Sequence, residues 1–164
     1  MRQLITAFCG PLIVRPMKHA AFTVFFILAS SALAAPLEIP AARRVILRSG
    51  KWTPSQAEAD AAFRCAQQFL TGPTVKEKYQ PSQLDLIRQH AREYRVQFVG
   101  QYRNGKKIIF CNFFPAQFPE EKQDPFSYWR QQLVGVMDGG FWFWRIDYDP
   151  QSDGCSEFSS NGYG

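Results

Sequence analysis

Carboxylates gather around one aromatic stretch near the C-terminus, where an acid–base pair could form. Five of them surround Phe141–Trp144: Asp138, Asp147, Asp149, Asp153 and Glu157. A buried pair of carboxyl groups can act as general acid and general base. Turn chemistry explains the aspartates that neighbour glycine and proline. Asp147 is the exception, and its plain structural role would be a cross-strand ion pair with Arg95 or Arg103.

Other catalytic chemistry finds little support in the sequence. His90 is the one histidine after residue 34, and its neighbours Arg88 and Arg92 favour a surface position. No set of His, Cys and carboxylate residues has metal-ligand spacing. Asp138-Gly139-Gly140 precedes a predicted strand, whereas phosphate binding needs a helix N-terminus there. We expect no catalytic residue, no metal site and no cofactor, and the sequence leans against an enzyme without deciding the question.

The first 34 residues have the pattern of a secretory signal peptide. An apolar run over residues 20–35 follows a short basic segment and contains Ala32-Leu33-Ala34, a small-x-small cleavage site. Translation from Met1 and from Met17 both fit. The run of about 16 residues is shorter than the roughly 20 that span a bilayer, so a membrane anchor is the weaker interpretation. We expect a periplasmic or secreted protein without stable membrane insertion.

Charge and length after the leader suit one small domain. Removing Arg2, Arg15 and Lys18 lowers the formal net charge from +5 to +2, which gives no reason to expect nucleic acid. The remaining chain of about 130 residues suits one core. We expect an extended N-terminal segment over residues 35–52 and a single domain over residues 53–164.

Two helices are predicted in the first half of the domain. Thr53-Pro54-Ser55-Gln56 places Thr at the N-cap and Pro at the first helical position, and Gly72-Pro73 ends the helix. Its predicted apolar stripe consists of Ala57, Ala61, Ala62, Cys65, Phe69 and Leu70. A shorter helix is predicted from Pro81, with Leu84, Ile87 and Ala91 on one face.

Four strands are predicted in the second half. Residues 94–103 alternate between apolar and polar side chains, as in a half-buried antiparallel strand. Asn104-Gly105 predicts a tight hairpin into residues 107–114. A connector over residues 115–132 leads to a long aromatic strand over 134–148, with a bulge or bend at Asp138-Gly139-Gly140. Residues 155–160 return as the last strand, and residues 43–48 could add a short edge strand.

The cysteines after the leader are Cys65, Cys111 and Cys155. In an oxidising compartment they give one disulfide and one free thiol. Cys111 and Cys155 fall on the predicted strands that flank the aromatic one, about 9.5 Å apart, beyond the Cα–Cα reach of about 7 Å. Cys65–Cys111 is therefore the predicted pair, although spacing alone does not choose it.

The order of elements predicts an α+β fold, with one long helix packed on a curved antiparallel sheet of about four strands. This layout resembles the cystatin-like and NTF2-like folds, a likeness that carries no activity by itself. Inhibitory cystatins carry Gln-x-Val-x-Gly at a hairpin tip. Gln97-Phe98-Val99-Gly100 is one residue shorter and lies mid-strand, so protease inhibition by that route is not expected.

A series of short motifs runs through residues 92–164. It comprises a Tyr-x-x-Gln-Phe/Tyr-x-Gly strand, a Gly-Lys hairpin into an Asn-containing strand, Asp-Gly-Gly, Tyr-Asp and a terminal Asn-Gly. The residues are Tyr94, Gln97, Phe98, Gly100, Gly105, Lys106, Asn112, Asp138, Gly139, Gly140, Tyr148, Asp149, Phe158, Asn161 and Gly162. Their order resembles that in a group of small, exported, uncharacterised bacterial proteins, and the resemblance implies no particular function.

One face of the predicted sheet is the best candidate for a binding site. If Trp142, Trp144, Ile146 and Tyr148 point to the helix, the alternate residues point away. The candidate binding residues on that outer face are Phe141, Phe143, Arg145, Asp147, Arg95, Gln97 and Arg103. Arginines beside exposed aromatics suit a protein or glycan partner. A plain solvated face is the competing interpretation, and a one-residue shift would exchange the Trp and Phe sets.

We therefore expect an exported envelope protein that acts as a non-catalytic binding module through one sheet face. The alternatives are a small-ligand carrier or pocket enzyme of NTF2-like type, and an inhibitor or immunity protein of a secreted enzyme. A carrier or enzyme needs a sizeable pocket lined by polar groups such as Arg145 and Asp147, which a binding module does not need. The sequence does not indicate the oligomeric state.

Overall fold

The computed structural model describes residues 37–72, 81–118 and 121–163. All of them belong to one compact unit that spans Leu33–Gly164. The predicted signal peptide lies outside the described residues. No helix within the described ranges is both long and apolar enough to cross a membrane.

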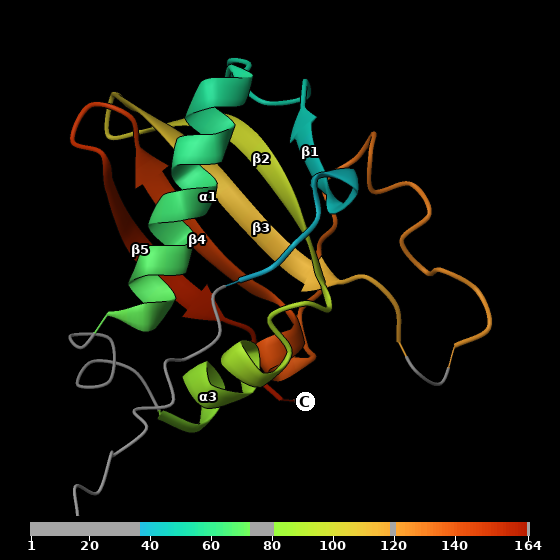
Figure 1. Cartoon of the computed structure of the whole chain (residues 1–164). Coiled ribbons are helices and arrows are strands. Elements are labelled where there is room, and N and C mark those ends of the chain that lie inside the picture. The colour runs from blue at the N-terminus through green and yellow to red at the C-terminus, as the bar shows by residue number, and fades with distance from the viewer. Residues whose placement is uncertain (1–36, 73–80, 119–120, 164) are drawn as a thin grey trace, which may run out of the picture. The chain divides into compact units, whose positions relative to one another are not determined.

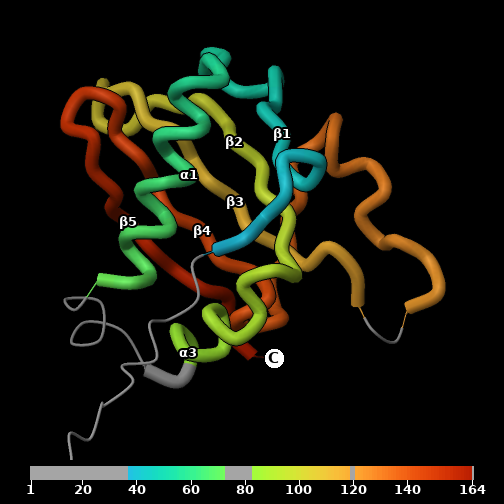
Figure 2. Tube along the Cα trace, viewed as in Figure 1, coloured from blue at the N-terminus to red at the C-terminus, as the bar shows by residue number. Residues whose placement is uncertain are grey.

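The fold is α+β, with an open sheet of five strands (Figure 1). The strands are β1 (Arg44–Leu47), β2 (Tyr94–Arg103), β3 (Lys106–Pro115), β4 (Trp144–Asp149) and β5 (Gly154–Ser160). They lie side by side in sequence order, as the tube in Figure 2 shows. The described ranges also contain two α-helices, α1 (Gln56–Thr71) and α3 (Pro81–Gln89), and two 3-10 turns, η1 (Ala41–Arg43) and η2 (Gly140–Trp142).

The sheet is mixed, which corrects the prediction of an antiparallel sheet of about four strands. Strands β2 to β5 form the predicted antiparallel meander. The edge strand β1 pairs with β2 in parallel, with Val45 opposite Gln97 and Leu47 opposite Val99. Both helices lie in the chain between β1 and β2, and a long crossover of this kind is what allows neighbouring strands to run parallel.

Helix α1 begins two residues later than predicted. Its N-cap is Ser55, whose Oγ accepts a hydrogen bond from the Glu58 amide, while the Glu58 carboxylate accepts one from the Ser55 amide. Ser55 and Glu58 are therefore the capping box, in place of Thr53 and Gln56. Both pairs have suitable side chains, so the sequence motif alone does not choose between them. The predicted end at Gly72 is confirmed.

The buried face of α1 differs partly from the predicted stripe. Its buried residues are Ala59, Ala62, Phe63, Ala66 and Leu70. Ala57 is exposed, whereas Cys65 and Phe69 are half-buried at the edge of the face. Three alanines on the buried face let α1 lie close to the sheet. In Figure 1 it crosses in front of β3 and β4.

The main core fills the space between the helices and the sheet. Helix α3 adds Leu84 and Ile87, which are fully buried, as its predicted apolar face requires. The sheet contributes the residues that point to α1, including Phe98, Cys111 and Trp144. The Trp144 ring stacks on Phe113 with 3.6 Å between ring centroids. Leu37 and Ile39 are also buried in this core, so the segment before β1 is part of the domain.

The β2–β3 hairpin forms at the predicted turn. Asn104 and Gly105 both have positive φ angles, 52° and 76°. Two left-handed residues in a two-residue loop make the tight turn whose twist matches that of the strands it joins. The chain therefore reverses between Arg103 and Lys106 without a bulge, and all ten residues of β2 pair with β3.

The long aromatic strand predicted over residues 134–148 is wrong in its first half. Gly139 and Gly140 both have left-handed backbone angles, which end any strand there, and η2 follows over Gly140–Trp142. A Cβ at Gly140 would lie 2.2 Å from the Tyr163 ring, so the chain comes too close for a larger residue. Strand β4 begins only at Trp144. It lies between β3 and β5, inside the sheet as predicted.

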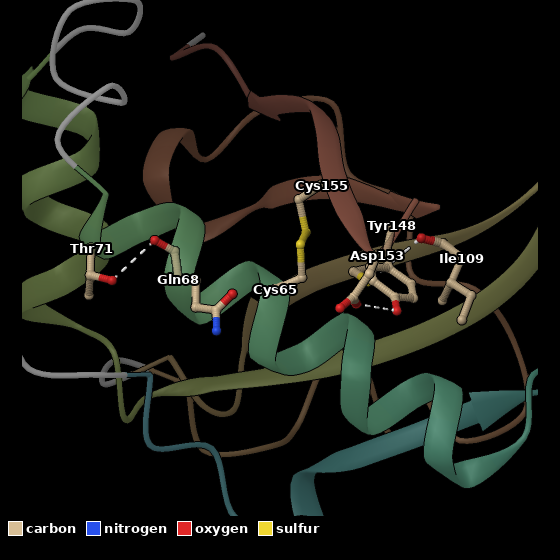
Figure 3. The surroundings of a disulfide bond; sticks show 8 residues. Cys65, Gln68, Thr71, Ile109, Tyr148, Asp153 and Cys155 are labelled. Carbon is tan, nitrogen blue, oxygen red and sulfur yellow. Dashed lines mark hydrogen bonds between the residues drawn. A yellow bond between two sulfur atoms is a disulfide. The ribbon is translucent and has the colours of Figure 1, made fainter. Parts of the chain in front are cut away.

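The disulfide joins Cys65 to Cys155, so the predicted pair Cys65–Cys111 is wrong (Figure 3). Helix α1 packs over β3, β4 and β5 alike, and its Cys65 faces the start of β5, with 6.0 Å between the two Cα atoms. The sequence alone could not say how far along the sheet the helix crosses. Cys111 keeps a free, fully buried thiol, whose pKa is raised by burial and by the nearby Asp147.

Candidate outer-face binding site

The two faces of β4 carry the residue sets that the alternation predicted. Trp144, Ile146 and Tyr148 belong to the core under α1. Arg145 and Asp147 project from the opposite, outer face, where they are paired in register with Asn112 and Phe110 of β3. The neighbouring positions of β2 on this face are Gln97 and Val99.

A second, smaller core covers one end of the outer face. The predicted connector covered residues 115–132, and from here on we use "connector" for residues 116–139, the segment between β3 and η2 (orange in Figure 1); residues 119 and 120 are not described. The buried residues of this second core are Phe114, Phe126, Trp129, Val134 and Phe143. Phe143, a candidate binding residue, is therefore only 7% exposed. The connector packs on the sheet through aromatic edge-to-face contacts, such as Phe126 on Phe143 at 5.8 Å.

Gln97 holds the connector to the sheet from beneath. Its side chain is fully buried, and its Nε2 donates hydrogen bonds to the carbonyl oxygens of Trp129 and Gln132 at 2.5 and 2.8 Å. Its Oε1 accepts from the Val134 amide and from Asn112 Nδ2, both at 3.0 Å. All four of these hydrogen bonds join Gln97 to the connector or to Asn112. Gln97 is thus a structural residue, not part of an exposed binding surface.

Arg95 also belongs to the covered end of the face. Its Nη1 forms an ion pair with Asp124 of the connector at 2.8 Å, and its guanidinium lies 5.3 Å from the centre of the Trp129 ring. The same group donates a hydrogen bond to the Ala116 carbonyl. The alternation of β2 was therefore predicted correctly. The prediction that its polar side is exposed to solvent was wrong for Arg95 and Gln97, because the connector buries that side.

Phe141 does not lie on the outer face at all. It is part of η2, and its ring stacks on His90 with 5.1 Å between centroids. The Tyr94 hydroxyl donates to the Phe141 carbonyl at 3.0 Å. His90 also contacts Trp142 and forms a 2.9 Å contact through Nδ1 with Glu93. These contacts explain both residues by packing, and they exclude Phe141 from the predicted surface.

Arg103 and Asp147 form the predicted cross-strand ion pair. Arg103 Nη2 lies 2.8 Å from Asp147 Oδ2, across the intervening strand β3. The Asp147 side chain is 4% exposed, whereas that of Arg103 is 46% exposed. Burial raises the pKa of the Asp147 carboxyl and outweighs the opposing effect of the Arg103 guanidinium.

The raised pKa of Asp147 predicts a pH dependence of stability. Below the ordinary value of 3.8 the carboxyl is protonated in both states. As pH rises, the unfolded chain loses the proton first, so the contribution of this group to stability is lost as pH passes through the folded pKa. Asp147→Asn has no ionisable group at this position, so the variant does not lose stability in this way as pH rises. The free energy of unfolding of the variant, minus that of the wild type, should therefore rise between about pH 3 and pH 7.

Urea unfolding at several pH values measures this difference. Arg103 is half exposed, so water can solvate it once its partner is neutral. A difference that falls as pH rises would mean that the ion pair with Arg103 outweighs the burial of Asp147.

The rest of the outer face is accessible, and we call it the open face. It consists of Gln101, Arg103, Phe110 and Arg145 from the sheet and Leu133, Val136 and Met137 from the connector. The three connector residues are 43%, 37% and 92% exposed. Arg145, Phe110 and Leu133 line a cavity of about 150 Å³ between connector and sheet. A second cavity, of about 340 Å³, is lined by Leu133, Val99, Gln101 and Lys51.

Among the seven candidate binding residues, the structure thus places Arg103 and Arg145 on the open face and buries Asp147 as the ion-pair partner of Arg103. It places Arg95, Gln97 and Phe143 under the connector and Phe141 elsewhere. The connector residues Leu133, Val136 and Met137 were missed. Val136 and Met137 were interpreted as part of a strand, and Leu133 lies between that strand and the predicted connector. Their clustering between glycines was a usable signal, since a strand inside a sheet seldom contains so many glycines.

Comparisons with protein-family models, with curated proteins and with solved structures found no match. The described residues contain no group of three or more His, Cys, Asp or Glu side chains that could hold a metal ion.

Proposed function

We propose that this protein is a non-catalytic binding module of the bacterial envelope and that it binds a protein partner through the open face. The observation that carries the proposal is the exposure of three large aliphatic side chains of one connector segment, Leu133, Val136 and Met137. Leu133 and Val136 line the cavity that Arg145 also lines, and Leu133 lines the second cavity as well. Apolar side chains exposed together, with arginine at their border, are a feature of protein interfaces.

The rigidity of this surface supports the proposal. Val134, which lies between the exposed residues, is buried, and both its amide and its carbonyl are hydrogen-bonded, to Gln97 and Asn112. Asn161 Nδ2 donates to the carbonyls of Val136 and Asp138, which holds the far end of the segment. The exposed side chains therefore stand on a backbone that is fixed before binding, which lowers the entropy cost of association.

The compartment is a second part of the proposal. The Cys65–Cys155 disulfide is compatible with an oxidising compartment, and the signal-peptide pattern of the leader supports export. A likeness to cystatin-like or NTF2-like folds remains a proposal at the level of fold, and no activity follows from it.

The packing speaks against a small-ligand carrier or pocket enzyme that uses the space between helix and sheet. Large side chains, among them Phe63, Phe98 and Trp144, fill most of that space. A cavity of about 340 Å³ remains between α1 and β1, but its charged residues Arg44 and Asp60 pair with each other at 4.0 Å, and neither Arg145 nor Asp147 lines it. The cavity that Arg145 lines is about 150 Å³ and does not include Asp147, which is paired with Arg103. Ligand pockets are usually larger, on the order of 300–1,000 Å³, and have several convergent polar groups. An inhibitor or immunity protein is one form that a protein-binding module can take.

A pull-down from an envelope extract tests the proposal. The tagged mature chain should retain a partner that Leu133→Glu/Met137→Glu loses by about tenfold or more, because two charges would then be buried against apolar surface. Gln68→Glu/Gln151→Glu, at exposed positions outside the open face, is the matched control and should retain the partner. Circular dichroism checks that all variants are folded. Equal retention by the open-face variant would contradict the proposal.

A further inference from the structure

The open face borders a basic edge of the sheet, and we propose that the partner presents an acidic polypeptide segment to it. An apolar side chain of that segment enters the 340 Å³ cavity beside Leu133, and its carboxylates lie against Arg48, Lys51, Arg103 and Lys106. This inference names the chemistry of the partner and rests on the proposed function.

The cavity has fixed walls. Its lining includes Lys51 from the turn after β1, Val99 and Gln101 from β2, and Leu133 from the connector. The Lys51 amide donates to the Gly100 carbonyl at 2.8 Å, and Trp52 Nε1 donates to the Gln101 carbonyl at 2.9 Å. A Cβ at Gly100 would lie 2.2 Å from the Trp52 carbonyl oxygen, so the turn lies directly on β2. The side chains of Val99 and Leu133 make part of this lining apolar.

Of the four cations, Lys51 lines this cavity, Arg48 lies in the same turn, and Arg103 and Lys106 lie at the adjoining hairpin end. Arg48 and Lys51 are exposed in the turn after β1, and within the described part of the chain neither has a carboxylate within ion-pair distance. Arg103 and Lys106 are opposite each other at the end of the β2–β3 hairpin, and paired positions project from the same face. Arg103 is ion-paired with the buried Asp147, and Lys106 interacts electrostatically with Asp149.

Two acidic groups of this side lie close to the cations. Asp147 is buried and paired with Arg103. Asp149 on β4, whose carboxylate accepts a hydrogen bond from the Gln151 amide, interacts electrostatically with Lys106. Glu157 is on β5. With strands about 4.8 Å apart, β5 is about 14 Å from β2, more than a Debye length at physiological salt. Glu58 lies at the start of α1, where Ser55 binds it. The four cations of the β1–β3 edge therefore outnumber the two carboxylates beside them, Asp147 and Asp149, and an acidic segment is the complement of the positive charge that remains.

The apolar groups favour a polypeptide over an acidic glycan. Leu133, Val136 and Met137 are exposed aliphatic side chains, and burying such surface yields roughly 25 cal/mol per Å². An acidic sugar chain offers carboxylates but has little apolar surface with which to cover these aliphatic side chains. A peptide that carries both a leucine-like side chain and flanking carboxylates matches the cavity and the cations together.

Binding of defined probes tests the inference. The peptide Asp-Glu-Leu-Glu-Asp should bind the mature chain at least about tenfold more tightly than its neutral counterpart Asn-Gln-Leu-Gln-Asn, and salt should weaken it. Arg48→Glu/Lys51→Glu should abolish this preference. Arg64→Glu/Lys122→Glu removes two exposed cations elsewhere and should keep it. Titration calorimetry measures the affinity for each peptide, and chemical-shift changes at Val99 and Gln101 show where it binds.

Three outcomes would overturn the inference: equal binding of the two peptides, insensitivity to Arg48→Glu/Lys51→Glu, or tighter binding of polygalacturonate, the acidic-glycan probe. The pull-down with Leu133→Glu/Met137→Glu separates a failure of the acidic-partner inference from a failure of the proposed binding function. If the partner is lost from that variant but retained by Arg48→Glu/Lys51→Glu in high salt, the binding module stands and the acidic partner is wrong.

Discussion

Replacing Cys65 and Cys155 by alanine is expected to lower the free energy of unfolding by about 4 kcal/mol, the largest effect of any change we consider. The disulfide spans 90 residues of sequence, from α1 to β5. In the chain-entropy account, closing so long a loop removes many conformations from the unfolded ensemble, and the native state loses little because both cysteines already lie in packed elements. Urea unfolding with and without dithiothreitol measures the effect.

Cys111→Ala is the matched control for the disulfide. Since Cys111 is free, this variant should respond to dithiothreitol as the wild type does, and Cys65→Ala/Cys155→Ala should not respond at all. If Cys111→Ala loses the response and Cys155→Ala keeps it, the pairing is Cys65–Cys111 and the arrangement of α1 on the sheet is wrong.

Gln97→Leu is expected to lower the free energy of unfolding by about 3 kcal/mol. Leucine fits the space of glutamine approximately but makes none of its four hydrogen bonds. Two carbonyls of the connector and the Val134 amide would lose their partners beneath the second core. Buried polar groups without partners cost about 1–3 kcal/mol each, and water reaching the loosened connector offsets part of the sum. Urea unfolding monitored by tryptophan fluorescence measures the change.

Gln101→Leu is the control for Gln97→Leu, because it makes the same substitution four residues farther along the same strand and on the same face. Gln101 is only half-buried. The hydrogen bond from Trp52 Nε1 goes to the backbone carbonyl of Gln101, which the substitution keeps. We expect a change within about 0.5 kcal/mol. Similar losses in both variants would mean that Gln97 does not hold the connector.

Local patterns predicted the local structure of this domain well. The alternation over residues 94–103 and the Asn104-Gly105 turn predicted β2 and the hairpin turn where they are observed, and β3 extends one residue beyond its predicted range at each end, because turn geometry sets strand register directly. The parity of β4 was also predicted, since burying Trp144, Ile146 and Tyr148 leaves Arg145 and Asp147 on the other face.

Features that depend on long-range packing could not be predicted. The parallel pairing of β1, the crossing point of α1 that selects Cys155, and the connector over the outer face each join segments far apart in sequence. The candidate site suffered most from this. Arg95 and Gln97 have the exposed, polar pattern of a binding face, and only the position of the connector shows that they bind this chain itself.

Site-specific photo-crosslinking in the envelope extract is the most direct test of the central claim that a protein binds the open face. A benzophenone amino acid in place of Met137, which is 92% exposed, should form a discrete adduct with the partner. The same group in place of Gln151, exposed in the β4–β5 turn, should form none. An adduct from position 151 and none from position 137 would contradict the account.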